Sequence, residues 1–111
     1  LADRAGIVEK RLDGPLRGYV DIAGPTLCAG WAQNTADPNT PVCLDIFSQG
    51  QRIGRVLANM YREDVREAGY GNGYQGFEFI LPEATAMPID VRRSTDGACL
   101  PLTEAAREEA A

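Results

Sequence analysis

Turn-forming residues interrupt this chain at short intervals, and most stretches between them alternate polar and apolar side chains. The segment VCLDIFS is the clearest case, because its apolar Val42, Leu44 and Ile46 would share one face. A period of two is expected of a strand that buries one face. Short strands at close spacing between glycine and proline turns predict an all-β fold, an antiparallel β-sandwich of about seven strands. The expected strands are 17–22, 26–34, 42–48, 52–61, 75–81, 89–94 and 98–102.

Glycines mark the expected turns and irregularities of these strands. Gly50 supplies the positive φ that a tight hairpin turn needs, and residues 95–97 predict a second hairpin turn. A glycine inside a strand often marks a bulge, which we expect at Gly54.

Two short helices are expected beside the strands. Residues 62–68 contain good helix formers with acidic residues early, and Gly69 stands where a helix end favours a left-handed residue. Thr103 is the expected N-cap of a C-terminal helix. A chain of 111 residues suits one core. The expected organisation is a linker 1–15, a β-sandwich module 16–102 and a C-terminal helical linker 103–111.

The charge balance argues against anionic partners. Lys and Arg number 11 against 16 Asp and Glu, which gives a net charge of −5. Phosphate backbones and anionic lipid repel such a chain, so we expect no nucleic-acid partner. The chain starts at Leu1, and no apolar run is long enough to span a bilayer, so we expect a soluble piece of a longer protein without membrane insertion. The compartment of that protein stays open.

Histidine and cysteine content bears on catalysis and metal binding. The chain has no histidine, the commonest metal ligand and general base, and this disfavours an enzyme. Its three cysteines are widely spaced, which fits neither a disulfide framework nor a metal site. We expect buried free thiols, with a bridge between Cys28 and Cys43 as the alternative in an exported protein. No metal and no cofactor is expected.

The glycines of AGYGNGYQGFEF, residues 68–79, have the spacing of a dinucleotide-binding loop. In that motif a strand leads into the glycine turn, and the following helix directs its N–H groups at the pyrophosphate. Here a helix-like segment precedes the glycines and a strand follows them. We therefore expect no phosphate site, and we interpret Gly71 and Gly73 as positive-φ residues that reverse the chain.

Three segments, GWAQN, PVCLDIFSQGQRIGRVLANMYREDVREAG and GNGYQGFEFILP, carry a resemblance that covers roughly Gly18 to Leu102. They resemble a small β-sandwich accessory module of bacterial multidomain proteins, often attached to glycosyltransferases and other glycan-related or surface proteins. The resemblance implies an accessory domain and assigns no catalytic residue. Its motif residues are Gly30, Trp31, Ala32, Gly50, Ile53, Gly54, Tyr61, Arg62, Asp64, Gly73, Gly76, Phe77, Phe79 and Pro82.

Aromatic side chains are the candidate glycan contacts. Trp31 has a flat face that could stack on a sugar ring, but its strand is otherwise small and apolar, which favours a core position. Tyr70 and Tyr74 flank the glycine loop and could either pack the loop or contact a ligand. Asn72 lies between them as a possible hydrogen-bond donor to a sugar hydroxyl.

Charged residues suggest weaker alternatives. Arg62 and Asp64 are expected to bind backbone groups around the internal helix, together with Tyr61. Asp37 and Asn39 could ligate calcium, although the spacing of an EF-hand is missing. No two carboxylates can be placed across a scissile bond from sequence, so no catalytic residue is expected. The carboxylates considered are Asp37, Asp45, Glu63 and Asp64.

These observations predict a noncatalytic accessory module that binds a polysaccharide or oligosaccharide, or that positions an attached glycan-active enzyme. Its expected ligand-binding residues are Tyr70, Asn72, Tyr74 and Trp31. The alternative is an interaction or spacer domain without a ligand, which contacts neighbouring domains of its parent chain or self-associates through a sheet edge.

Overall fold

The computed structural model describes residues 14–110, so the expected linker 1–15 lies almost wholly outside the described residues. The described chain forms six strands and two short helices. In chain order these elements are β1 (Leu16–Ala23), β2 (Leu27–Asn34), β3 (Val42–Ser48), β4 (Gln51–Ala58), α2 (Glu63–Glu67), β5 (Gly76–Ile80), β6 (Ile89–Arg93) and α3 (Glu104–Ala110).

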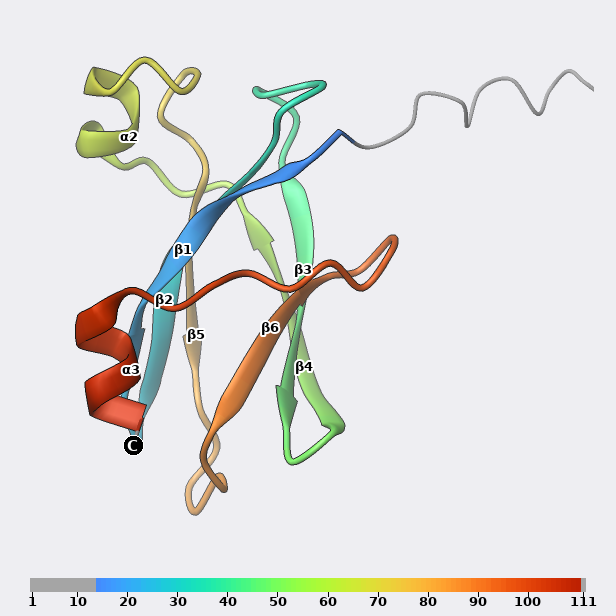
Figure 1. The fold of residues 1–111 in the computed structure, drawn as a ribbon, viewed down its shortest axis with the longest axis vertical. Coiled ribbons are helices and arrows are strands. Elements are labelled where there is room, and N and C mark those ends of the chain that lie inside the picture. Colours follow the sequence, from blue (N-terminus) through green and yellow to red (C-terminus); the bar gives the residue numbers. More distant parts are fainter. Residues whose placement is uncertain (1–13, 111) are drawn as a thin grey trace, which may run out of the picture.

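Two three-stranded sheets form the body of the molecule (Figure 1). Sheet A has the strand order β1-β2-β5, and sheet B has the order β4-β3-β6. Every strand pairing in both sheets is antiparallel. The expected mainly-β, two-sheet fold is therefore confirmed, with one short internal helix, α2, close to its predicted position.

The core consists of side chains that the alternation of the strands directs inward. Val42, Leu44 and Ile46 of β3 are all buried, as the period of two predicted. Phe77 of β5 is the largest of the fully buried side chains. Each such side chain contributes roughly 1.5–3 kcal/mol through removal of apolar surface from water, so these residues hold the two sheets together.

The expected seventh strand, 98–102, is wrong as one strand, because the segment divides its pairing between the two sheets. Leu100 N donates to Val91 O of β6 at 2.9 Å, whereas Val20 N of β1 donates to Pro101 O at 2.8 Å. In Figure 1 this segment crosses in front of the molecule from β6 to β1. Proline has no N–H for a ladder, so the change of partner falls where the pairing is interrupted in any case. The segment covers one edge of each sheet.

The C-terminal helix α3 packs against β1 (Figure 1). Its predicted N-cap is confirmed, since Thr103 Oγ1 accepts a hydrogen bond from Ala106 N at 3.2 Å. Ala106 is fully buried and belongs to the core cluster. No helix among residues 14–110 is long and apolar enough to cross a membrane.

A bulge interrupts each sheet. In β1, the register against β2 shifts between Val20 and Ile22, so Asp21 is an extra residue. In β4, the register against β3 shifts so that Ile53 is extra, next to Gly54, where the sequence predicted a bulge. A bulge reverses the side to which the following residues point. Ile22 is therefore exposed, although Val20 is completely buried.

A buried arginine fastens the hairpin turn after β6. Arg93 is 5% exposed, and its Nε and Nη2 donate to the two carboxylate oxygens of Asp96 at 3.0 and 2.8 Å. Its Nη1 donates to Gly14 O at 2.9 Å, which ties the start of the described chain to the same turn. The Arg93 hydrogen bonds hold the pKa of Asp96 at about 2, below its ordinary 3.8.

This pKa predicts a loss of stability in acid. A carboxyl group whose pKa is lower in the folded state stabilises the fold above its unfolded-state pKa, and that contribution disappears as the pH falls through the folded-state value. The free energy of unfolding should therefore decrease between about pH 4 and about pH 2. Asp96→Asn should remove roughly 1 kcal/mol near neutral pH, since the carboxylate is half exposed and screened, and should flatten this part of the pH profile. Urea unfolding across the pH range measures both effects.

Asp90→Asn is the matched control for this prediction, because Asp90 is also about half exposed and contacts one arginine, Arg92, at 3.2 Å. It should lower stability by less than Asp96→Asn does. An acid profile unchanged by Asp96→Asn would contradict the assignment.

Candidate functional site

The segment between β4 and β5 folds back against sheet A at one end of the molecule. Its base is closed by two hydrogen bonds, in which Met60 N donates to Gly76 O at 2.9 Å and Gly76 N donates to Met60 O at 2.8 Å. Beyond this pair, Arg62 N donates to Gly73 O at 2.7 Å, which also joins the two arms of the segment. Figure 1 shows the segment, with α2, beyond the upper end of sheet A.

The glycines of this segment are turn residues, as predicted. Gly69 follows the end of α2 with φ +84°, and Gly71 and Gly73 have φ of +128° and +91°. Gly76 begins strand β5, so no helix starts at the glycine loop. The expectation that this loop lacks the arrangement of a dinucleotide site is confirmed, because that arrangement needs a helix directly after the glycines.

Trp31 lies on the outer face of sheet A under Tyr70. Its neighbour Ala32 points into the core, and Trp31 stands opposite the exposed Tyr19 of β1. The rings of Trp31 and Tyr70 stack with centroids 5.5 Å apart and an interplanar angle of 12°. The guanidinium of Arg17 lies 4.6 Å from the centroid of the Tyr70 ring. Trp31 is therefore buried, but outside the core between the sheets, and its indole is no open platform.

Amide side chains join the glycine loop to the loop before β3. Asn39 Oδ1 accepts from Asn72 N at 2.9 Å. Asn72 Oδ1 accepts from Tyr74 N at 3.0 Å and from Gln75 Nε2 at 2.9 Å. The side-chain oxygen of Asn72, Oδ1, thus holds the loop together. Its Nδ2 makes no hydrogen bond within residues 14–110, so this donor stays available.

Two amide atoms under the glycine loop have no partner. Gln33 Nε2 and Gln75 Oε1 are buried without a hydrogen bond, in side chains that are 1% and 2% exposed. A Cβ on Gly71 would lie 3.0 Å from Gln33 Nε2, so the loop backbone directly covers this amide. An unpaired buried polar atom costs roughly 1–3 kcal/mol. The hydrogen bonding under the glycine loop is therefore incomplete and lowers the local stability.

Tyr61 and Tyr74 form an exposed aromatic pair. Their ring centroids are 5.1 Å apart with an interplanar angle of 57°. Tyr61 is 44% exposed and Tyr74 is 52% exposed. The sequence identified Tyr74 as a candidate contact, but it assigned Tyr61 to a structural role only. The proximity of the two rings depends on the path of the chain around α2, which sequence spacing does not reveal.

A groove of about 310 Å³ runs along the outer face of sheet A beside Tyr61. Its floor includes Ala29 and Gly30 of β2. The residues around this floor are Asp21, Ile22, Met60, Tyr61, Arg62, Gly76, Phe77 and Glu78. The bulge at Asp21 brings both an acidic and an apolar side chain of β1 into the groove.

Arg62 lines the groove and binds the carboxylates near it. Its Nε and Nη2 donate to Asp64 Oδ1 at 3.1 Å and Oδ2 at 2.7 Å, and its Nη1 donates to Asp21. The Arg62 hydrogen bonds lower the pKa of Asp64 below its ordinary value. The prediction that Arg62 binds backbone carbonyls is therefore wrong, since its side chain binds two carboxylates. Asp64 does accept a backbone hydrogen bond, from Val65 N at 3.0 Å.

Two other candidate acids, Asp45 and Asp37, lie in different parts of the fold. Asp45 is on sheet B with Arg55, and Asp37 accepts a hydrogen bond from Thr40 Oγ1 at 2.8 Å in its own loop. The structure adds no ligand to the calcium site considered at Asp37 and Asn39, because Asn39 Oδ1 already accepts a hydrogen bond from Asn72 N. No group of three or more His, Cys, Asp or Glu side chains that could hold a metal ion occurs in the part of the chain that the structure describes.

The cysteines are free thiols in different surroundings. Cys28 is buried in the core, where desolvation raises its pKa to about 12. Cys43 is half-buried and accepts a hydrogen bond from Ser94 Oγ at 3.4 Å, and Cys99 is exposed. The expectation of buried free thiols therefore holds fully only for Cys28. The alternative of a bridge between Cys28 and Cys43 is wrong for this structure, in which both are unpaired.

No protein-family model matches the chain, and no curated protein or solved structure is similar to it at a significant level.

Proposed function

We propose that the chain is a noncatalytic accessory module that binds a glycan, or holds an attached glycan-active enzyme near one, through the outer face of sheet A. The observation that carries the proposal is the exposed pair Tyr61 and Tyr74 at a groove with carboxylates in its wall. The resemblance noted from the sequence leads to the same expectation.

The aromatic pair offers the apolar half of a sugar site. One face of a pyranose presents a patch of C–H groups, and a flat aromatic ring covers such a patch without requiring a deep pocket. Tyr61 lines the groove directly, and the tilted Tyr74 adds a second exposed ring next to it. Tyr70 instead covers Trp31, so we assign these two residues to support of the site.

The groove offers the polar half of such a site. Glu78 makes no hydrogen bond or ion pair within residues 14–110, so both of its oxygens can accept from sugar hydroxyls. Asp21 is held by Arg62, which fixes the carboxylate in place at the groove wall. A few convergent polar groups beside an apolar surface are what orient a small ligand.

The proposal is tested by titrating the protein with a panel of neutral oligosaccharides while recording backbone amide NMR shifts. A ligand should shift the amides of residues 60–62 and 76–78 saturably. Tyr61→Ala should weaken the binding about tenfold, because loss of an aromatic contact costs roughly 0.5–1.5 kcal/mol in addition to the lost apolar area. Tyr61→Phe should bind nearly as well as the parent.

Tyr19→Ala is the matched control, since Tyr19 is 47% exposed on the same strand as Asp21 but does not line this groove. It should leave the affinity unchanged. Absence of any saturable shift across the panel would reject the proposal, and so would an equal effect of the two alanine variants.

A second function, protein–protein interaction, is favoured by apolar side chains exposed on sheet A. Ile80 is 73% exposed on β5, and Ile22 is 37% exposed on β1. Exposed apolar patches on a sheet are typical of surfaces that meet another protein. This function requires assembly of the domain with itself or with its parent chain. Sedimentation velocity over a concentration series, with Ile80→Lys as the disrupting variant, separates it from glycan binding.

A further inference from the structure

The outer face of sheet B carries three arginines around one buried carboxylate. The pairing register places Asp45 of β3 directly between Arg55 of β4 and Arg92 of β6. Two positions further along β3, on the same face, Phe47 stands opposite Arg52 of β4. Residues opposite one another on adjacent strands have Cβ atoms about 4.5–5.5 Å apart, so Arg55 and Arg92 flank Asp45 closely on its two sides, and Arg52 flanks Phe47 in the neighbouring row.

The bulge in β4 is what brings two of these arginines together. In a regular strand, Arg52 and Arg55 would point to opposite faces, because they are separated by an odd number of positions. The extra residue Ile53 places both arginines on the same face, with Arg52 opposite Phe47 and Arg55 opposite Asp45. Bulges that redirect a side chain in this way are over-represented next to functional sites.

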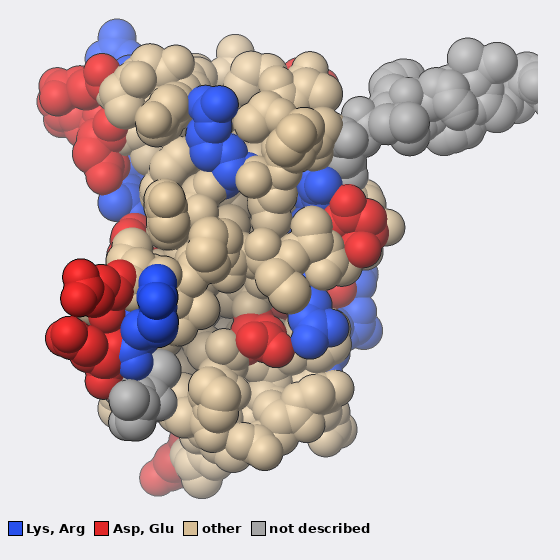
Figure 2. Space-filling view, in the orientation of Figure 1, with Lys and Arg blue, Asp and Glu red and all other residues tan. Residues whose placement is uncertain are grey.

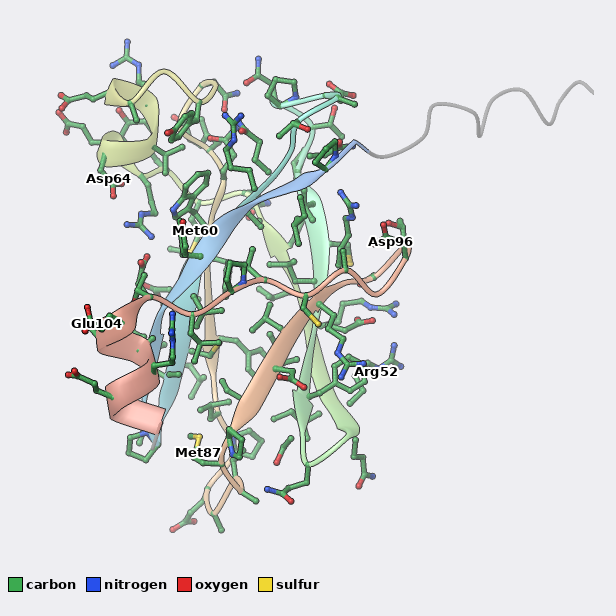
Figure 3. All side chains as sticks on the ribbon, viewed as in Figure 1. Arg52, Met60, Asp64, Met87, Asp96 and Glu104 are labelled. Carbon is green, nitrogen blue, oxygen red and sulfur yellow. The ribbon has the colours of Figure 1, made fainter. Side chains whose placement is uncertain are left out.

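The hydrogen-bonding capacity of these arginines is largely unused. Arg55 donates to Asp45 through Nε at 2.6 Å and Nη2 at 3.4 Å. Arg52 makes no hydrogen bond within residues 14–110 and approaches Asp45 only to 3.8 Å. A guanidinium has about five N–H donors, so Arg52 has nearly its whole set available. Figure 3 shows its side chain at the sheet B side of the molecule.

Arg92 is held in place, but part of its hydrogen-bonding capacity is unused. Its guanidinium carbon lies 4.7 Å from the centroid of the Phe47 ring, and its Nη2 donates to Asp90 at 3.2 Å. Its Nε is buried and has no partner. A cation fixed against an aromatic ring loses little rotamer freedom when it binds, which favours recognition of a further acceptor.

The local charge is opposite in sign to that of the whole chain. The three arginines face two carboxylates, Asp45 and Asp90, so the group has a positive balance, while the chain has a net charge of −5. Figure 2 shows acidic side chains gathered over α2 and α3. A hollow of about 350 Å³ next to the bulge is lined by Arg52, Ile53, Gly54 and Arg55.

We propose that this face of sheet B is an oxyanion-binding site, in which Arg52 of β4 and Arg92 of β6 donate to a carboxylate, sulfate or phosphate group, while Asp45 holds Arg55 in position beside Arg52. Guanidinium groups recognise such oxyanions through pairs of parallel N–H···O bonds. The site is separate from the groove on sheet A and does not depend on the function proposed for that groove.

The test follows the arginine Nε–H signals by NMR in the whole chain. Sodium sulfate and sodium phosphate are titrated against sodium chloride at matched ionic strength, and an oligogalacturonate is titrated against its neutral galactose counterpart. The Arg52 and Arg92 signals should shift saturably with the oxyanions and not with chloride. Arg52→Gln should weaken the binding at least tenfold, as expected for loss of hydrogen bonds to a charged group.

Arg66→Gln is the control, because Arg66 is an exposed arginine on α2 and its loss changes the net charge equally. It should leave the affinity unchanged. Binding of the inorganic ions alone would assign the site to a small anion, and tighter binding of the oligogalacturonate would assign it to an acidic glycan. Shifts that chloride reproduces, or an equal effect of Arg66→Gln, would overturn the proposal.

Discussion

Phe77→Ala is expected to lower the free energy of unfolding by about 3–5 kcal/mol, which is a large share of the total for a domain of this size. Phe77 is 2% exposed and is the largest fully buried side chain of the described core. Its removal takes away apolar burial and leaves a cavity between two sheets that cannot collapse fully around it. Urea or thermal unfolding followed by circular dichroism measures the loss.

Ile80→Ala is the matched control in the same strand. Ile80 is 73% exposed, so its truncation should change the stability by no more than about 0.5 kcal/mol. The ratio between the two effects tests the face assignment of β5 directly. Similar costs for the two substitutions would mean that β5 does not present Phe77 to the core.

Gly30→Ala should cost about 3 kcal/mol or more, at the upper end of the range for overpacking. A Cβ at this position would lie 2.1 Å from the backbone oxygen of Tyr19 and 2.9 Å from the Cα of Val20. These obstacles are backbone atoms of the adjacent strand, so no rotamer change can relieve the clash. The variant must separate β1 from β2, the two strands that carry Trp31 and the bulge at Asp21.

Gly50→Asn controls for the general effect of replacing a glycine. Gly50 has φ +80° in the turn between β3 and β4, and a Cβ there would meet nothing within 4 Å. Asparagine tolerates the left-handed region, so the stability should stay within about 1 kcal/mol of the parent. Denaturant unfolding of both variants provides the comparison. A mild effect of Gly30→Ala would contradict the close approach of β1 and β2.

The two bulges have a common consequence for the proposed sites. The bulge in β1 places Asp21 and Ile22 in the groove of sheet A, and the bulge in β4 places Arg52 beside Arg55 on sheet B. Each site therefore depends on an interruption of the regular alternation. A strand without the extra residue would carry the same side chains to the opposite face.

The candidate site could be predicted only in part. The aromatic and amide residues of the glycine loop were identified because they are contiguous in sequence, and Tyr74 and Asn72 keep exposed groups that a ligand can reach. Trp31 was expected in the core or as a ligand contact, and it is instead buried on the outer face of sheet A under Tyr70, which lies 39 positions further along the chain. Groups this far apart are brought together by packing, which local patterns do not specify.

Six of the seven expected strands, the hairpin turns, the end of α2 and the Thr103 cap follow from the local sequence. Each depends on side chains within a few residues of one another, where alternation, glycine conformation and capping act directly. Long-range packing, by contrast, fixes where the segment 98–102 changes from one sheet to the other, the exposure of Ile22, the contact of Tyr61 with Tyr74, and the placement of Arg52 on the same face as Arg55. These features arise from long-range pairing and register, whose energies depend on the partner strand rather than on the local sequence.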